Sequence, residues 1–272
     1  MHFNRNILKD FARLCNLAYR SGEEMSENYK ARPYNLNDQC SVLYHCNKNP
    51  EFITRGNDSQ MYICKYDDKL SVIFRGTESK RDILTDLNII QIKMPISNTR
   101  EKEYPEVHWG FYNQFQYLEP ELDKVLSDYN NDNDSEREVV FSGHSLGGAL
   151  ATIAALKYAK KYPELEVNCV TFGSPRVGDP KFAKYFDESV NDSYRFVNDN
   201  DPIPCVPTAW RYKHVKGCQW LYQDKVLNEI TAWRGWRFFK NYILSFFGYG
   251  YDASKDHSCV GYCDDLECMK DE

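Results

Sequence analysis

The residues best suited to chemistry in this chain surround Ser145, which occupies the centre of a G-x-S-x-G pattern with glycines at 143 and 147. The pattern follows an apolar, β-rich run (138–142) and opens an alanine-rich segment (146–162), so it joins an expected strand to an expected helix. So sharp a turn strains the backbone of the serine, and side chains two positions to either side would collide, which explains both glycines. The pattern predicts Ser145 as a nucleophile. It also predicts the N–H of Leu146, at the helix N-terminus, as a donor to a developing oxyanion.

A serine hydroxyl is a weak nucleophile near neutral pH, so a base and a carboxylate must accompany it. In a strand–turn–helix arrangement of this kind the chain order is serine, acid, histidine. Asp199 and Asp201 both follow an expected strand at 194–197, where the carboxyl end of a parallel strand gathers catalytic groups. Pro202 and Pro204 stiffen the loop directly after Asp201, which favours Asp201 over Asp199.

Two histidines follow the serine, His214 and His257. The alternating segment 210–215 predicts a strand around His214, and a strand histidine is more often a packed or surface residue than a base. His257 lies just before the last segment of the chain. Position favours His257, with His214 as the alternative.

The elements that must position these residues alternate between strands and helices. Two β-rich runs, 61–66 and 70–74, flank a tight polar turn and predict a hairpin. Further strands are expected at 138–142, 167–172 and 194–197, and helices at 6–20, 82–87, 111–129, 146–162 and 180–190, whereas the polar segment 21–58 is expected to be loop-rich. This alternation predicts a mostly parallel sheet with crossover helices, and no repeat or linker divides the chain, so one domain is expected over residues 1–272.

Composition excludes several other classes of protein. The 272 residues carry a net charge of −6, which argues against a dedicated nucleic-acid binder, and 42% are hydrophobic, enough for a substantial core. No apolar run approaches the roughly 20 residues that span a bilayer. Charged residues interrupt the first segment, so no secretory h-region is recognisable and a cytoplasmic location is slightly favoured over a chain that begins after a removed signal.

Five segments together resemble the class 3 lipases, which include the fungal triacylglycerol lipases. They are V-I-F-R-G-T (72–77), V-H-W-G-F (107–111), G-H-S-L-G-G-A (143–149), T-F-G-S-P-R-V-G (171–178) and the loop 198–204, and they occur in the family's order. The resemblance implies an α/β-hydrolase fold, with a mostly parallel central sheet flanked by helices, and hydrolysis of carboxylic esters. Such chemistry requires no metal or organic cofactor.

The resemblance also implies a role for each matching residue. Ser145 corresponds to the nucleophile, Asp201 to the acid and His257 to the base, with Asp256 and Tyr262 as supporting neighbours. The second oxyanion donor corresponds to Thr77, and His108 corresponds to a supporting core residue near the site. The family's lid corresponds to 78–87, an amphipathic but charged segment whose apolar members are Ile83, Leu84 and Leu87.

The segment from Thr231 to Tyr251 interleaves aromatic side chains with Arg234, Arg237 and Lys240. This mixture favours a helix packed beside the site, with a surface that docks on a membrane or lipid droplet as the alternative. The expected activity is hydrolysis of acylglycerols by a lipase or esterase through an acyl-enzyme. The alternatives are a phospholipase A1-like or galactolipase-like enzyme and a catalytically silent lipid-binding protein.

Overall fold

The computed structural model describes residues 4–19, 40–48, 59–66, 69–76, 90–131, 137–222, 225–227 and 256–268. Thr77, the expected lid with Ile83, Leu84 and Leu87, and the segment from Thr231 to Tyr251 lie outside the described residues. The predictions made for them therefore stay predictions, as does that of a single domain. Within the described residues no helix is both long enough and apolar enough to span a bilayer.

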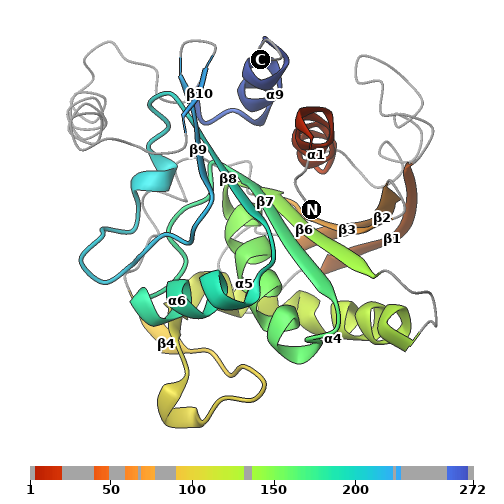
Figure 1. Cartoon of the computed structure of the whole chain (residues 1–272), viewed down its shortest axis with the longest axis vertical. Helices are drawn as coiled ribbons and strands as arrows, with labels where there is room; N and C mark the ends of the chain where they lie inside the picture. Colours follow the sequence, from red (N-terminus) through yellow and green to blue (C-terminus); the bar gives the residue numbers. More distant parts are fainter. Residues whose placement is uncertain are drawn as a thin grey trace.

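An eight-stranded sheet with the order β1-β2-β3-β6-β7-β8-β9-β10 runs through the molecule (Figure 1). Its strands are β1 (Cys40–Lys48), β2 (Ser59–Tyr66), β3 (Lys69–Phe74), β6 (Glu138–His144), β7 (Glu166–Phe172), β8 (Ser193–Asn198), β9 (Cys218–Tyr222) and β10 (Lys225–Leu227). The central pairings from β3 to β9 are parallel, and antiparallel pairs close both edges. The expected hairpin (β2–β3) and the mostly parallel sheet are both confirmed.

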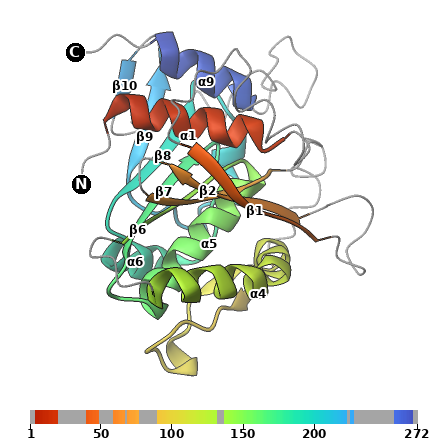
Figure 2. The ribbon, with the colours of Figure 1, turned by 90° about the vertical axis from the view of Figure 1, so that its right-hand side faces the viewer.

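Helices cover both faces of this sheet (Figures 1 and 2). On one face lie α4 (Trp109–Asn131), α5 (Leu146–Lys161) and α6 (Pro180–Ser189), and on the other α1 (Arg5–Leu17) and α9 (Cys259–Cys268) lie side by side. A small sheet of β4 (Gln91–Lys93) and β5 (Glu106–His108) leads into α4. The short helices η1 (Glu101–Glu103) and η2 (Ile203–Cys205) complete the described elements.

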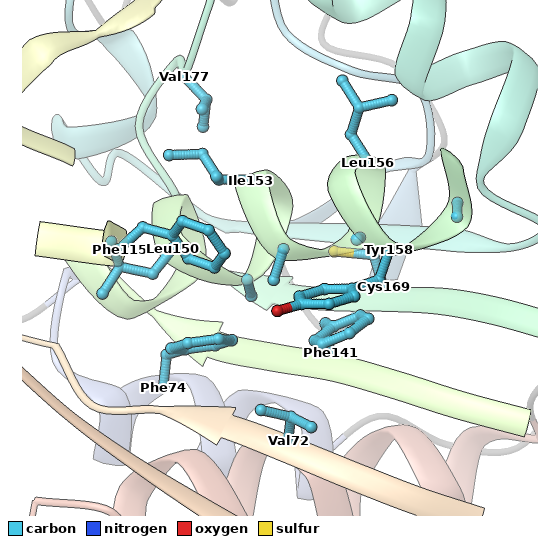
Figure 3. Packing of buried hydrophobic residues seen from close by; sticks show 14 of the residues in the cluster. Val72, Phe74, Phe115, Phe141, Leu150, Ile153, Leu156, Tyr158, Cys169 and Val177 are labelled. Carbon is cyan, nitrogen blue, oxygen red and sulfur yellow. The ribbon is translucent and has the colours of Figure 1, made fainter. Parts of the chain in front are cut away.

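The two cores follow from the period-two alternation of side chains along a strand. In β6, Val139 and Phe141 face the core under α5, whereas Val140 faces the core under α1 and α9. Because both faces are covered, β6 and β7 are buried over nearly their whole length and are mostly apolar, as parallel strands usually are. Figure 3 shows Tyr158 of α5 lying over Phe141, whereas Leu150 lies beside Phe115. The buried alanines of α5 allow the helix to approach the sheet closely.

Two sequence predictions differ from the structure, the first of them over the described residues 40–48. The polar segment 21–58 was expected to be loop-rich, yet β1 lies within it and pairs antiparallel with β2, with a register shift between Val42 and Tyr44. An edge strand needs only one partner and no continuous apolar pattern, so its signal in the sequence is weak. The expected strand at 210–215 is absent, because residues 209–211 form a turn and Lys213 makes only an isolated bridge to Gly178.

Candidate active site

Ser145 lies on the tight turn between β6 and α5. Its φ of 59° and ψ of −125° place a non-glycine residue in a strained conformation, as the sequence pattern predicted. A Cβ on Gly147 would lie 2.1 Å from the carbonyl oxygen of Phe74, and one on Gly143 would lie 2.3 Å from the carbonyl oxygen of Gly147. The glycines are therefore required because the turn is pressed against both its own backbone and the end of β3.

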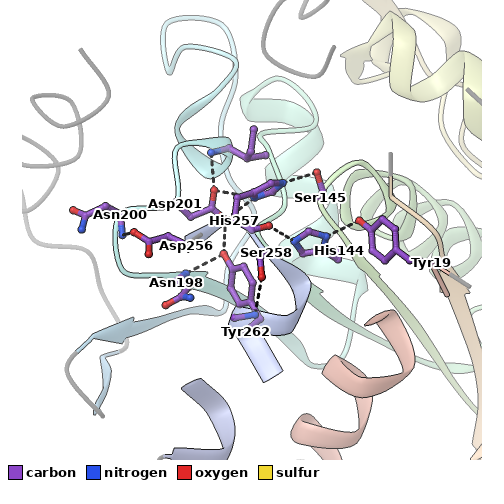
Figure 4. A network of polar contacts seen from close by, with 12 residues as sticks. Tyr19, His144, Ser145, Asn198, Asn200, Asp201, Asp256, His257, Ser258 and Tyr262 are labelled. Carbon is purple, nitrogen blue, oxygen red and sulfur yellow. Dashed lines mark hydrogen bonds and ion pairs between the residues drawn. The ribbon is translucent and has the colours of Figure 1, made fainter. Parts of the chain in front are cut away.

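The structure brings Ser145, His257 and Asp201 into one hydrogen-bonded chain (Figure 4). His257 Nε2 lies 2.8 Å from Ser145 Oγ, and Nδ1 lies 2.9 and 2.8 Å from the two carboxylate oxygens of Asp201. All three residues are at least 97% buried. A carboxylate can only accept, so Nδ1 carries the proton and Nε2 is left to accept the hydroxyl proton of the serine.

Hydrogen bonds from its surroundings hold the Asp201 carboxylate in place. The Tyr262 hydroxyl donates to Oδ2 at 2.6 Å, and the backbone N–H of Ile203 donates to Oδ1 at 2.9 Å. The same hydroxyl accepts the backbone N–H of Asn198 at 2.9 Å. Burial, followed by the nearby Asp201 charge, raises the pKa of Tyr262 well above 10, so the phenol stays protonated as a donor.

The loops that carry the acid and the histidine are also tied together directly. Asp256, the residue before His257, accepts the backbone N–H of Asn200 at 3.2 Å. The sequence resemblance suggested Asp256 and Tyr262 as supporting neighbours, and both link the C-terminal segment to the loop after β8. The hydrogen bonds of Tyr262 and Asp256 with this loop therefore fix the distance between Asp201 and His257.

The rival residues lie outside this chain of hydrogen bonds. His214 Nε2 lies 2.7 Å from the carbonyl oxygen of Pro204 and donates to it. Burial, reinforced by Arg195 and Arg176, lowers the pKa of His214 well below 6.5, so the ring is neutral near pH 7. The carbonyl oxygen of Asp199 accepts the indole N–H of Trp220 at 3.0 Å, whereas it is the Asp201 carboxylate that meets His257.

Gly173, directly after β7, forms a wall of the site that sequence reasoning did not single out. Its φ is +60°, and a Cβ there would lie 2.7 Å from Asp201 Oδ2 and 3.0 Å from His257 Nδ1. A side chain at this position would both strain the backbone and push Asp201 and His257 apart. The sequence places this glycine at the carboxyl end of an expected strand, within the family-like segment T-F-G-S-P-R-V-G (171–178), but neither signal assigned it a role.

The remaining predicted site residues are placed only in part. Leu146 begins α5, and the first N–H groups of a helix have no acceptor within it, so its N–H suits an oxyanion donor. Thr77 itself is not described, but a Cβ on the preceding Gly76 would lie 2.6 Å from the carbonyl oxygen of His144, so β3 ends beside the serine turn. His108 is buried at the start of α4, where its Nδ1 accepts the N–H of Phe111 at 3.3 Å.

The profile of the class 3 lipases matches residues 71–210, just over half of the chain, and spans β3, the serine turn and the acid loop. The chain belongs to the class 3 lipase family. A lipase of Rhizomucor miehei is 32% identical over 155 residues, which cover 55% of this chain and 41% of that protein. A secreted mono- and diacylglycerol lipase of Fusarium solani is 34% identical over 135 residues, which cover 47% of this chain and 40% of that protein.

The class 3 lipase matches therefore span less than half the length of these two curated relatives. Among solved structures, the triacylglyceride lipase of Rhizomucor miehei superposes with a TM-score of 0.68 at 24% identity, over 82% of this chain and 84% of that chain. This likeness, together with the parallel sheet and its flanking helices, confirms the α/β-hydrolase fold expected from the sequence.

Proposed function

We propose that this class 3 lipase hydrolyses the acyl esters of lipids, with Ser145 as nucleophile, His257 as base and Asp201 as acid. The observation that carries the proposal is the hydrogen-bonded chain from Ser145 Oγ through His257 to the Asp201 carboxylate, with 2.8 Å separations. A strained serine at a helix N-terminus, a neutral imidazole nitrogen facing it and a buried carboxylate behind the ring are the parts that acyl transfer requires.

In the first step, Ser145 Oγ bonds to the ester carbonyl carbon while its proton passes to His257 Nε2. The negative charge that develops on the carbonyl oxygen is held by the N–H of Leu146 and by Thr77, the predicted second donor. Removing one such donor typically costs about 10²–10³ in turnover. The C–O bond to the alcohol then breaks, and the imidazolium returns its proton to the departing alcohol oxygen.

In the second step, water attacks the acyl-enzyme and gives a proton to His257 Nε2. The bond to Ser145 Oγ breaks, the serine recovers its proton from the imidazolium, and the fatty acid leaves. Asp201 stays ionised throughout; it keeps the proton on Nδ1 and stabilises the imidazolium that forms in each step. The steps balance without a metal or an organic cofactor.

The names of the relatives favour acylglycerols as the substrates of this protein, because the matched proteins are named lipases or mono- and diacylglycerol lipases. The segment from Thr231 to Tyr251 remains the candidate for contact with a membrane or lipid droplet. The triad attacks any acyl ester that reaches it, so activity on phospholipids is an outcome that the test below must separate.

The proposed function is tested with a fluorophosphonate probe and with lipids of different head groups. We expect the probe to label the wild-type protein and not S145A, and fatty acid to be released from di- and monoacylglycerols faster than from phosphatidylcholine. Faster release from phosphatidylcholine would change the substrate class. A folded wild-type protein that the probe does not label and that releases no fatty acid would refute enzymatic activity and favour a lipid-binding role.

A further inference from the structure

Behind the proposed triad, a second row of polar side chains reaches His257 through its backbone (Figure 4). The Tyr19 hydroxyl lies 2.7 Å from His144 Nδ1, and His144 Nε2 lies 3.0 Å from the carbonyl oxygen of His257. We infer that Tyr19 and His144 are positioning residues, which fix the backbone of His257 so that its ring faces Ser145. The inference rests on the proposed function, because it assigns a role only if His257 is the base.

The protons in this row have one arrangement for a neutral His144. The carbonyl oxygen of His257 can only accept, so the proton must be on His144 Nε2. His144 Nδ1 is then an acceptor, and the Tyr19 hydroxyl donates to it. Tyr19 thereby selects the tautomer of His144 that can hold His257, just as Asp201 selects the tautomer of His257 that can accept the serine proton.

His144 itself is not placed to act as the base. Both ring nitrogens are engaged, one by Tyr19 and one by the His257 carbonyl, and the residue is 96% buried. Its ring lies against that of His257 with centroids 4.7 Å apart and planes tilted by 32°. His144 therefore contacts His257 both through a hydrogen bond to its backbone and through its ring, and it restrains the position of each.

The N-terminal helix acquires a function from this arrangement. Tyr19 follows α1, which packs against α9 and the sheet through a buried apolar face. The Tyr19 ring meets His144 edge-on at 5.8 Å, and the Arg75 guanidinium lies 5.9 Å from its centroid. A Cβ on Gly76 would lie 2.2 Å from the Tyr19 hydroxyl oxygen, so glycine at 76 admits the phenol between the end of β3 and the serine turn.

The expected defect is therefore in alignment and not in substrate binding. A displacement of about 1 Å in a catalytic group can reduce a rate by about 10²-fold. We expect H144M, which fills the space without a donor, to lower kcat by about 10–100-fold and leave KM within twofold. H144Q should stay within about threefold of wild type, because its amide N–H can donate to the His257 carbonyl while its oxygen accepts from Tyr19.

The experiment measures kcat and KM on p-nitrophenyl butyrate, and the rate of phosphonylation by a fluorophosphonate, for wild type, H144M, H144Q, Y19F and the double variant Y19F/H144M. Thermal melting reports folding for each variant. Y185F is the matched control, since it removes a tyrosine hydroxyl that donates to the backbone carbonyl of Glu103 at 3.4 Å on the surface of α6. S145A gives the background rate.

The role is supported if Y19F lowers kcat several-fold, if H144Q rescues the loss seen in H144M, and if Y19F adds little to H144M. It is overturned if H144M keeps kcat within twofold of wild type, if H144Q loses as much as H144M, or if the two losses multiply independently. Should H144M fail to fold, Y19F decides the matter: a several-fold loss in kcat with KM unchanged supports the role, and a kcat within twofold of wild type overturns it. An S145A protein as active as wild type would instead refute the proposed function, and the positioning role with it.

Discussion

Asp201 offers the sharpest test of the proposed mechanism, because its carboxylate accepts from three donors at once. His257 Nδ1, the N–H of Ile203 and the hydroxyl of Tyr262 all converge on its two oxygens. Asparagine at 201 supplies one acceptor oxygen and one donor group. The backbone N–H of Ile203 cannot turn, so we expect the amide oxygen to take the place of Oδ1, 2.9 Å from His257 Nδ1, and the amide NH₂ to take the place of Oδ2, which is nearer to Nδ1 at 2.8 Å.

The cost follows from this geometry. An NH₂ facing Nδ1 makes that nitrogen an acceptor and moves the proton to Nε2, which can then no longer take the proton of Ser145. Restoring the productive tautomer breaks the hydrogen bond from the amide NH₂ to Nδ1, which costs about 1.5 kcal/mol. Losing the carboxylate opposite the imidazolium forfeits about 4 kcal/mol at an effective dielectric constant of about 20. Together these amount to about 5.5 kcal/mol, or a loss of about 10⁴ in kcat.

The assay compares D201N with D199N on p-nitrophenyl butyrate, with thermal melting of both as the measure of folding. Asp199 has a φ of 22°, a conformation that asparagine also adopts readily, and it is the Asp201 carboxylate that contacts His257. We expect D199N to stay within threefold of wild type and D201N to lose about 10⁴ in kcat with KM little changed. A folded D201N that keeps more than a tenth of wild-type kcat would refute the reasoning, as would an equal loss in D199N.

Three further outcomes are expected. We expect G147A to lower the free energy of unfolding by at least 1 kcal/mol and to abolish most activity, because its Cβ would lie 2.1 Å from the Phe74 carbonyl oxygen. Urea denaturation and kcat measure the two effects. A variant as stable and as active as wild type would contradict this prediction. Burial holds the pKa of His214 well below 6.5, so below that pH only the unfolded chain takes up this proton and stability falls by up to about 1.4 kcal/mol per pH unit. Urea midpoints from pH 7.5 to 5 should therefore fall less steeply in H214Q, and parallel curves would count against this account. Cys268 is exposed, whereas burial raises the pKa of Cys15 to about 12. Iodoacetamide at pH 8 should therefore modify Cys268 in the native protein and Cys15 only after unfolding. Peptide mass mapping measures both rates, and equal rates in the native protein would show that this account is mistaken.

Local patterns in the sequence were sufficient for the parts of this protein that depend on local physics. The strand–turn–helix around Ser145 is encoded by an apolar run, two glycines and an alanine-rich helix within 25 residues of one another, so the strained serine turn could be predicted in place. The order of strands and helices followed from their periodicities. The loop after Asp201 favoured it over Asp199 and chain position favoured His257 over His214, and the family motifs pointed to the same two residues. The edge strand β1 was missed because pairing on one side leaves little pattern in the sequence.

Tertiary structure alone decided which distant groups meet. Tyr19 and His257 are separated by most of the chain, and nothing near either residue in the sequence records that His144 bridges them. The requirement for glycine at 173 is likewise a matter of which side chains lie opposite it. Sequence periodicity specifies the face of a helix or strand that becomes buried, whereas a hydrogen bond across the fold depends on the packing of whole elements, here α1 and α9 against the sheet.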